Sequence, residues 1–277
     1  MTDALDVPVD CVGRSEEASE TAELEPLLRL AALLEADWPL AAGGPIPPGW
    51  HWVYFLPRTA QSRLGADGHE GGDGILPDLP GLRRMWAGSQ FVFDGSLRIG
   101  ERLLRRSRIV QAQLKRGRSG AFILIRLEHS IEGEGGLVRE GQDLVFQAPT
   151  GQAEGAGAAT PLPAADFERM VKPDPVLLFR FSAVTFNAHR IHYDRPYATA
   201  VEGYPDLVVH GPLQALLMLD LLRRARPQAR IANFSFRAER AAFLPAPLRI
   251  GGRASGAAFD LWIESAGLAT SRARAES

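Results

Sequence analysis

One apolar helix in the second half of the chain constrains the fold more than any other feature. The segment HGPLQALLMLDLLRRARP has leucines on nearly every side, Pro212 in its first turn, arginines in its last turn and Pro227 as its stop. A helix that is apolar all round has to be enclosed by other elements. Strand-like runs flank it, so we expect a sheet to wrap round it, which predicts an α+β fold.

Several runs have the alternation and turn punctuation of antiparallel strands. We expect a meander over FVFDGSLRIG, ERLLRRSRIVQAQL, SGAFILIRLEHSI and QDLVFQA, and further strands at PVLLFRFSAVTF, IANFSFRAERAAFLPAPLRIGGRA and GAAFDLWIES. The bulky run 50–55 predicts a first strand or an extended lid over a pocket. Residues 62–90 are rich in Gly, Pro and Asp and predict a long loop. Leucine and alanine spacing predicts one amphipathic helix over 23–38.

The chain contains an internal echo. Phe91-Val-Phe93 is followed by SLRIGER, and Phe234-Ser-Phe236 is followed by PLRIGGR. This repeat predicts a duplicated fold, and the Ala-, Gly- and Pro-rich stretch between the copies predicts a linker. We therefore expect a disordered tail at 1–22, an N-terminal half at 23–147, a linker at 148–165 and a C-terminal half at 166–277.

Composition excludes several classes of protein. The net charge is −2 and the arginines are scattered, which argues against nucleic-acid binding. Cys11 is the only cysteine, so a disulfide framework and a thiolate zinc site are excluded, and a reducing cytoplasm is expected. The amino-terminal stretch has no apolar signal region, and no apolar run reaches the roughly 18 residues of a membrane span. We expect neither export nor membrane insertion.

The stretch FNAHRIHYD, residues 186–194, concentrates two of the six histidines with an asparagine and an aspartate. Together with FSAVT before it and HGPLQALLM after it, this stretch resembles the MaoC-like dehydratase and (R)-specific enoyl-CoA hydratase superfamily. PPGWHWVYFLP, RRMWAG and SLRIGERLLRRSRI resemble the branch that contains the mitochondrial 3-hydroxyacyl-thioester dehydratase, mesaconyl-C4-CoA hydratases and itaconyl-CoA hydratases. The resemblance covers roughly residues 23–265 and implies a double hot-dog fold.

The resemblance implies a hydro-lyase acting on enoyl-CoA or 3-hydroxyacyl-CoA, or on the corresponding carrier-protein thioester, with no metal and no nicotinamide cofactor. The superfamily motif is D-x-N-P-x-H, whose Asp and His activate water. Laid on this chain without gaps, its His falls on His192, its Asn on His189 and its Asp on Asn187. With a two-residue insertion, Thr185 and Asn187 take the Asp and Asn positions. Neither alignment supplies the carboxylate.

The side chains of this motif limit which residues can act as acid and base. Hydration of an enoyl thioester needs a proton acceptor, a proton donor at Cα and a stabiliser for the enolate-like oxygen. Asn187 can orient water but cannot take its proton at neutral pH. We therefore predict His192 as the acid and base, since the ordinary histidine pKa is about 6.5. His189 is its predicted partner and second proton carrier.

The resemblance also assigns groups that hold the thioester. The family glycine before the central helix falls on Gly211, whose N–H at the positive helix end is the predicted oxyanion donor. Arg190, or a basic residue of RRMWAG, is suited to pair with a free carboxylate on a mesaconyl, citramalyl or itaconyl chain. The predicted substrate-binding residues are Arg190, His210, Asp194, Arg84 and Trp86. Asp194 is alternatively a residue that orients one of the histidines.

The N-terminal half has no counterpart of the apolar helix. We infer that this half lacks the long central helix, that each chain has one active site in its C-terminal half, and that the acyl group reaches into the N-terminal half. A homodimer is expected by analogy, because hot-dog sheets often pair.

Other readings of the same residues remain open. His189, His192 and Asp194 have the spacing of a metal half-site, or the histidines simply cap a strand end. A hot-dog thioesterase would use a carboxylate near the helix, for which Asp206 and Asp220 are candidates. A non-catalytic acyl-thioester binding protein would also explain the missing Asp.

Overall fold

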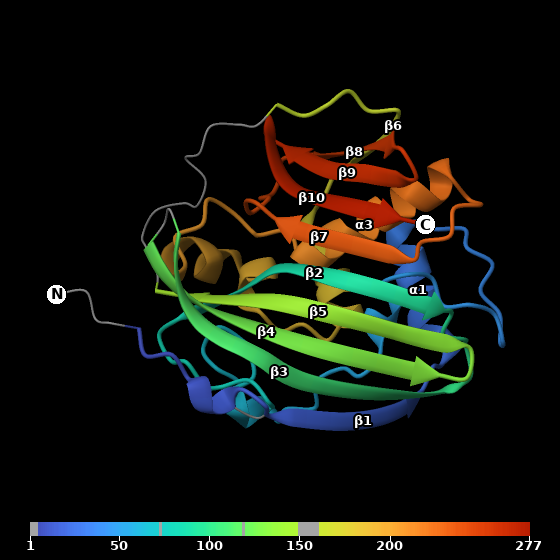
Figure 1. The fold of residues 1–277 in the computed structure, drawn as a ribbon. Helices are drawn as coiled ribbons and strands as arrows, with labels where there is room; N and C mark the ends of the chain where they lie inside the picture. The colour runs from blue at the N-terminus through green and yellow to red at the C-terminus, as the bar shows by residue number, and fades with distance from the viewer. Residues whose placement is uncertain (1–4, 72–73, 118–119, 149–160) are drawn as a thin grey trace.

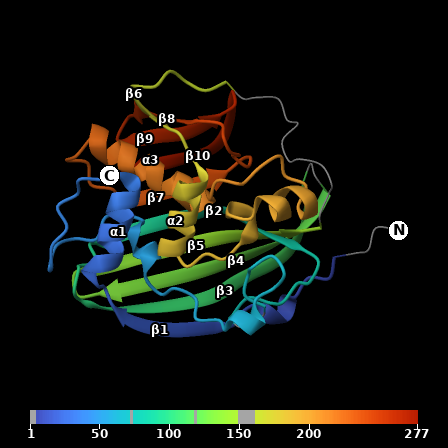
Figure 2. The ribbon, with the colours of Figure 1, turned by 180° about the vertical axis from the view of Figure 1, so that it is seen from behind.

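The computed structural model describes residues 5–71, 74–117, 120–148 and 161–277. In these residues one antiparallel sheet of ten strands carries α1, α2 and α3 on a single face (Figure 1; Figure 2 shows that face). The strands lie in the order β1-β3-β4-β5-β2-β7-β10-β9-β8-β6. Their bounds are β1 Ser15–Thr21, β2 Arg83–Gly95, β3 Arg102–Gly117, β4 Gly120–Gly133, β5 Gly136–Gln147, β6 Phe167–Val171, β7 Asn233–Ala238, β8 Leu248–Ser255, β9 Ala258–Ser265 and β10 Leu268–Glu276.

The sheet consists of two similar halves. Each half contributes five strands, and in each half three consecutive strands form a meander, β3-β4-β5 and β8-β9-β10. The halves join where β2 pairs with β7, and Phe91 lies directly opposite Phe234 in that pairing. The two aromatic segments of the sequence echo are therefore the two central strands, which confirms the predicted duplication and the predicted α+β double hot-dog fold.

Helix α3 (Gly211–Ala225) packs mainly against the strands of the C-terminal half, β8 above all, and also reaches β2. Every residue from Leu213 to Leu222 is buried, and a proline occupies the first turn, as the sequence predicts. Burial of each leucine side chain stabilises the fold by about 1.5–3 kcal/mol. Asp220 lies in this buried stretch, and its carboxylate is paired with the guanidinium groups of Arg169, Arg223 and Arg224.

The other two helices begin the two halves. Helix α1 (Leu24–Leu34) lies where the helix at 23–38 was expected. Helix α2 (Pro175–Val184) replaces the strand expected at PVLLFRFSAVTF, so that prediction is wrong. The Asp174 carboxylate accepts the Leu177 N–H at 2.7 Å and Pro175 occupies the first turn, a start signal that outweighs the strand preference of the aromatic residues.

The N-terminal half has no counterpart of α3 in the described part of residues 35–82. A short 3₁₀ turn, η2 (Trp50–Val53), packs against α3 instead, which corrects the strand or lid predicted over 50–55. The approach is so close that a Cβ on Gly49 would lie 2.8 Å from a methyl group of Leu216. The prediction that this half lacks a long central helix is confirmed for the described residues.

Two boundaries differ from the prediction at the start of the sheet. Residues 15–21 form the edge strand β1, so the tail predicted over 1–22 is wrong for this segment. Glu16 and Glu17 form ion pairs with Arg105 and Arg106 of β3 at 2.8 and 2.9 Å. Charged residues are common on edge strands, and in the sequence alone these glutamates resemble an acidic tail. Strand β2 begins at Arg83, inside the loop predicted over 62–90.

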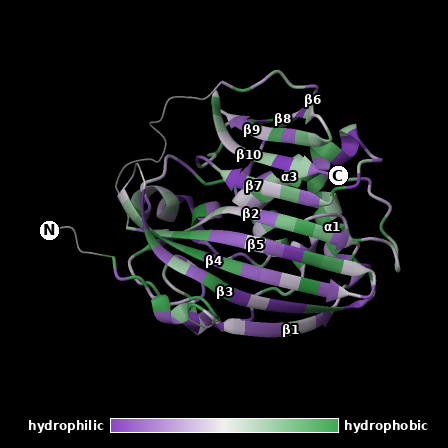
Figure 3. Ribbon diagram, in the orientation of Figure 1, coloured by the Kyte–Doolittle hydropathy of each residue, from purple (hydrophilic) through white to green (hydrophobic). Residues whose placement is uncertain are grey.

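Hydrophilic and hydrophobic residues alternate along the strands, as expected for a sheet with one face on the helices (Figure 3). Most of the predicted linker, residues 149–160, lies outside the described residues, and 161–165 have no regular structure. None of the helices in the described ranges is long and apolar enough to cross a bilayer.

Candidate active site

Four of the six histidines form one cluster at the amino-terminal end of α3. The rings of His192 and His210 stack with centroids 3.6 Å apart, His189 meets His192 edge-on at 5.4 Å, and His69 lies over His189 at 3.9 Å. The motif reaches this place because α2 ends at Val184 and the chain then turns back along the helix end. We call these four residues the histidine cluster.

His192 has a defined tautomer. Its Nδ1 lies 2.7 Å from the Val208 carbonyl oxygen, and a carbonyl only accepts, so Nδ1 carries the proton and Nε2 keeps a lone pair. The side chain is 7 % exposed. Burial lowers the pKa of His192 to about 4, so the ring is a neutral base at pH 7. This arrangement fits the predicted role of His192 as proton acceptor.

His210 supports the His192 ring from behind. It is fully buried between His192 and Phe181, and its Nε2 lies 2.9 Å from the Ser182 hydroxyl oxygen. Its Nδ1 has no protein hydrogen-bond partner. Burial lowers the pKa of His210 well below its ordinary value. The ring is fully enclosed in this structure, and the contact of His210 with substrate stays a prediction.

Asn187 shapes the backbone of the motif. Its side-chain oxygen accepts the His189 N–H at 2.9 Å, forming an Asx turn that carries His189 towards the cluster. This bond uses one of the two lone pairs of the amide oxygen, so the second lone pair and the NH₂ group can serve the water-positioning role predicted for Asn187. His189 is 9 % exposed, and burial holds its pKa far below the ordinary value, so it too is neutral.

Arg190 and Asp194 are occupied with each other. The Arg190 guanidinium donates to the Asp194 carboxylate at 2.7 and 2.9 Å, lies 4.0 Å over the Tyr197 ring and reaches the Ala66 carbonyl oxygen at 2.9 Å. Asp194 also accepts the Tyr197 N–H at 3.1 Å. The two side chains form an i,i+4 ion pair, and the substrate-binding role given to both stays a prediction. The predicted metal half-site with Asp194 is not assembled.

Two residues that no sequence pattern had indicated, Asp67 and His69, lie at the histidine cluster. His69 Nδ1 lies 2.8 Å from the Asp67 carboxylate, and the His69 backbone N–H donates to the same carboxylate at 3.0 Å. Hydrogen bonds from His69 hold the pKa of Asp67 far below its usual range although burial opposes this. An Asp-Gly-His sequence in a long glycine-rich loop was the available signal.

Asp67, His69 and His189 bring their ligand atoms within 4.8 Å of one another, as a metal site would require. The rings of His69 and His189 nevertheless face each other at 3.9 Å with a 37° tilt. Stacked rings do not aim two nitrogen lone pairs at one point, as tetrahedral coordination demands. The group therefore reads as a hydrogen-bonded and stacked set rather than as a metal centre.

Gly211 begins α3 against the indole of Trp86. A Cβ on Gly211 would lie 2.7 Å from Cε3 of Trp86, so only glycine fits there. The N–H groups of a first helical turn have no partner within the helix and carry its positive end. Trp86 stacks on Phe236 at 4.8 Å and meets Trp52 edge-on at 5.8 Å. The two indoles form an apolar wall from the N-terminal half beside the oxyanion position.

Arg84 lies at the edge of the histidine cluster, 3.3 Å from the Glu70 carboxylate. Its charge contributes to the lowered pKa of both His69 and His189. The structure therefore brings Arg84 and Trp86 close to the catalytic motif, as expected, although they precede it by about a hundred residues. The neighbouring Arg83 is paired with Glu202 instead.

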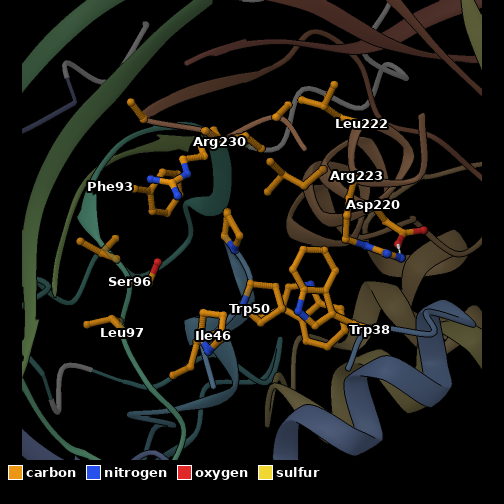
Figure 4. A pocket seen from close by; sticks show the side chains of 18 of the residues that line it. Trp38, Ile46, Trp50, Phe93, Ser96, Leu97, Asp220, Leu222, Arg223 and Arg230 are labelled. Atoms are coloured by element: carbon orange, nitrogen blue, oxygen red, sulfur yellow. Dashed lines mark hydrogen bonds and ion pairs between the residues drawn. The ribbon is translucent and has the colours of Figure 1, made fainter. Parts of the chain in front are cut away.

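A cavity of about 600 Å³ lies at the other end of α3 (Figure 4). Trp38, Ile46 and Trp50 form one side, Phe93 and Leu97 another, and the Asp220–Arg223 pair lies at its edge. No residue of the histidine cluster lines it. A helix of this length separates its two ends by roughly 20 Å. The histidines predicted to carry the chemistry therefore lie outside this cavity.

The thioesterase reading lacks a free carboxylate. Asp220 is enclosed by three guanidinium groups, and Asp206 accepts from Arg195 at 2.9 Å and from the Leu207 N–H at 2.6 Å. Neither side chain contacts the histidine cluster. The cluster instead presents the neutral imidazoles of His189 and His192 at the amino terminus of α3. Such a pair is suited to taking a proton from water and returning it to carbon.

The fold is that of a hot-dog dehydratase. The chain belongs to the family described as hydroxyacyl-thioester dehydratase type 2, whose sequence profile matches residues 49–244. It is accordingly a hydro-lyase that adds water to an enoyl thioester or removes it from a 3-hydroxyacyl thioester.

Named relatives agree with this assignment. The chain is 44 % identical over 260 residues to mesaconyl-C(4)-CoA hydratase from Chloroflexus aurantiacus, covering 90 % of both chains. It is 44 % identical over 94 residues to the mitochondrial hydroxyacyl-thioester dehydratase type 2 of Schizosaccharomyces pombe, covering 33 % of this chain and 30 % of that one. The crystal structure of HtdX from Mycobacterium tuberculosis shares the fold, with a TM-score of 0.69 at 16 % identity over 95 % of this chain and 100 % of that one.

Proposed function

We propose that the chain hydrates a short unsaturated CoA thioester of the mesaconyl-C4 type, with His192 as the acid and base. The observation that carries the proposal is the fixed tautomer of His192, whose Nε2 lone pair lies beside the amino terminus of α3. The relative from Chloroflexus aurantiacus, named for mesaconyl-C(4)-CoA, supports the acyl class.

In the reaction, water attacks Cβ of the enoyl group while His192 Nε2 takes one of its protons. The carbon–carbon π bond breaks, and its electrons move to the thioester oxygen, where the Gly211 N–H stabilises them. The imidazolium then returns its proton to Cα, so no net proton is gained or lost. Because the cluster histidines are neutral at pH 7, the proton that Cα needs is the one that water has just released.

The surroundings suit a short acyl group. Trp86 stands beside Gly211 and Trp52 meets Trp86 edge-on, which supports a short acyl end lying against the N-terminal half. Arg84 is the basic side chain at the cluster and is the candidate partner for a free acyl carboxylate. We further propose a cytoplasmic homodimer with one active site per chain.

The test is mass spectrometry of the products after incubation with mesaconyl-C4-, itaconyl- and crotonyl-CoA. The wild-type protein should give the hydrated CoA ester, and His192→Ala should reduce the rate by about 10²–10⁴-fold. His129→Ala is the matched control, because His129 belongs to the sheet of the N-terminal half and bonds Ser107. Free CoA as the product would indicate a thioesterase, and intact substrates with all three proteins would indicate a binding protein.

A further inference from the structure

The C-terminal half gives the histidine cluster no carboxylate. Asn187 stands at the family Asp position and uses its oxygen on the His189 N–H, and Asp194 is turned to Arg190. A neutral imidazole that takes a proton from water becomes an imidazolium in a buried site. Such a charge is costly without a negative partner. The proposed reaction therefore calls for a carboxylate from elsewhere in the fold.

A loop of the N-terminal half docks on the catalytic motif. The Asp67 carbonyl oxygen accepts the Arg190 N–H at 2.8 Å, and the Ala66 carbonyl oxygen accepts from the Arg190 guanidinium at 2.9 Å. Between these bonds, Gly68 has φ +91° and lies so close that a Cβ there would be 1.9 Å from the Ala188 carbonyl oxygen. Only glycine permits this approach.

The docked loop delivers one carboxylate and one imidazole to the cluster. The carboxylate of Asp67 fixes His69 with Nδ1–H donated to it, which leaves the lone pair on Nε2. The His69 ring lies over His189 at 3.9 Å, and His189 in turn meets His192. A carboxylate that fixes the tautomer of a histidine and stabilises its cationic form is a recurrent catalytic device.

We propose that Asp67, acting through His69, supplies the negative charge that the catalytic motif of the C-terminal half lacks. Asp67 is a positioning residue: it stays ionised, and its charge stabilises the imidazolium that forms on His192 while the water proton is in transit. This inference rests on the proposed hydratase function, and it assigns the single active site of the chain to residues of both halves.

The charged groups around His69 make the proposal testable by pH. Asp67 and Glu70 raise the pKa of His69, whereas Arg84 and burial lower it. At His189, Asp67 raises the pKa, and burial, the neighbouring histidines and Arg84 lower it. Removal of the Asp67 charge therefore has one direction, a further fall in the proton affinity of both rings.

The experiment compares Asp67→Asn with Asp143→Asn in steady-state hydration and in NMR titration of the histidine rings. Asparagine keeps the oxygen that accepts the His69 N–H, so the loop turn survives. Asp143 is the matched control because its carboxylate is 34 % exposed against 28 % for Asp67 and is paired with one basic group, Arg126. Thermal unfolding of each variant reports whether it is folded.

For Asp67→Asn we expect kcat to fall by about 100-fold or more with KM changed little, and the acid limb of the pH profile to move to lower pH. The NMR pKa values of His69 and His189 should fall as well. Asp67→Glu should restore part of kcat. If kcat, the acid limb and both pKa values match those of Asp143→Asn, the inference is wrong.

The two proposals fail separately. A wild-type protein that hydrates none of the thioesters refutes the proposed function. In that case the NMR titration still tests whether the Asp67 charge acts on the cluster. A wild-type protein that hydrates mesaconyl-C4-CoA while Asp67→Asn does so equally well refutes only the role given to Asp67.

Discussion

Substitution of Gly68 by alanine should separate activity from folding. An ordinary contact to the Ala188 carbonyl oxygen begins near 3.4 Å, whereas the new Cβ would stand at 1.9 Å, so the loop has to retreat by about 1.5 Å. Misplacement of about 1 Å costs roughly 100-fold in rate. We therefore expect kcat to fall by about two orders of magnitude.

The cost in stability should be smaller and can be measured independently. An alanine forced to φ +91° is strained by about 1–3 kcal/mol. Gly81→Ala is the control for that strain alone, because Gly81 has φ +78° and nothing lies within 4 Å of its Cβ position. Gly74→Ala, with an open Cβ position and no positive φ, is the control for substitution in the same loop.

The assay is the initial rate of hydration of mesaconyl-C4-CoA together with urea unfolding of each variant. Gly68→Ala should lose at least as much stability as Gly81→Ala, because its loop also leaves its hydrogen bonds to Arg190, while only Gly68→Ala should lose activity. Wild-type kcat in Gly68→Ala would refute the view that the docked loop belongs to the active site. A loss of activity in Gly81→Ala equal to that in Gly68→Ala would assign the effect to loop strain rather than to docking.

Two further outcomes follow from the cluster and the helix end. Burial lowers the pKa of His69, His189, His192 and His210, to about 4 for His192, so between pH 6.5 and 4 the unfolded chain binds more protons than the folded one. The free energy of unfolding should therefore be at its full value above pH 6.5 and fall by several kcal/mol as the pH drops towards 4. A urea midpoint that is the same at pH 7.5 and pH 5 would contradict this. Gly211→Ala should displace Trp86 and lower kcat at least tenfold, with partial recovery in the double variant with Trp86→Ala. Because alanine keeps the backbone N–H, full activity in Gly211→Ala alone would refute the need for the close approach of Gly211 to Trp86.

Local signals predicted the elements that depend on local physics. Helix α3 was evident from its leucines, its proline start and its arginine end, because these act within a few residues of one another. The same kind of signal was present at Asp174-Pro175 before α2, but the aromatic run after it suggested a strand. Strand β1 exists only through its pairing with β3, some ninety residues further on, which no local pattern reveals.

The candidate site was predictable only on one side. His189 and His192 stand in one segment and Gly211 in the next, and the resemblance to a known family predicted a role for each of them. Asp67 and His69 meet that motif across more than a hundred residues of chain, and nothing in their own neighbourhood names His189 as their partner. The sequence also did not show that Arg190 pairs with Asp194, because that depends on the i,i+4 geometry of the folded backbone.

The pairing of β2 with β7 joins the two similar halves of the sheet, and the histidine cluster takes residues from both of them. The C-terminal half carries His189 and His192, and the N-terminal half contributes the loop with Asp67 and His69 that docks beside them. A change in residues 65–70 of one half should therefore affect residues 187–190 of the other. Across descendants of this gene, these two segments should vary together, as the facing surfaces of two bound proteins do.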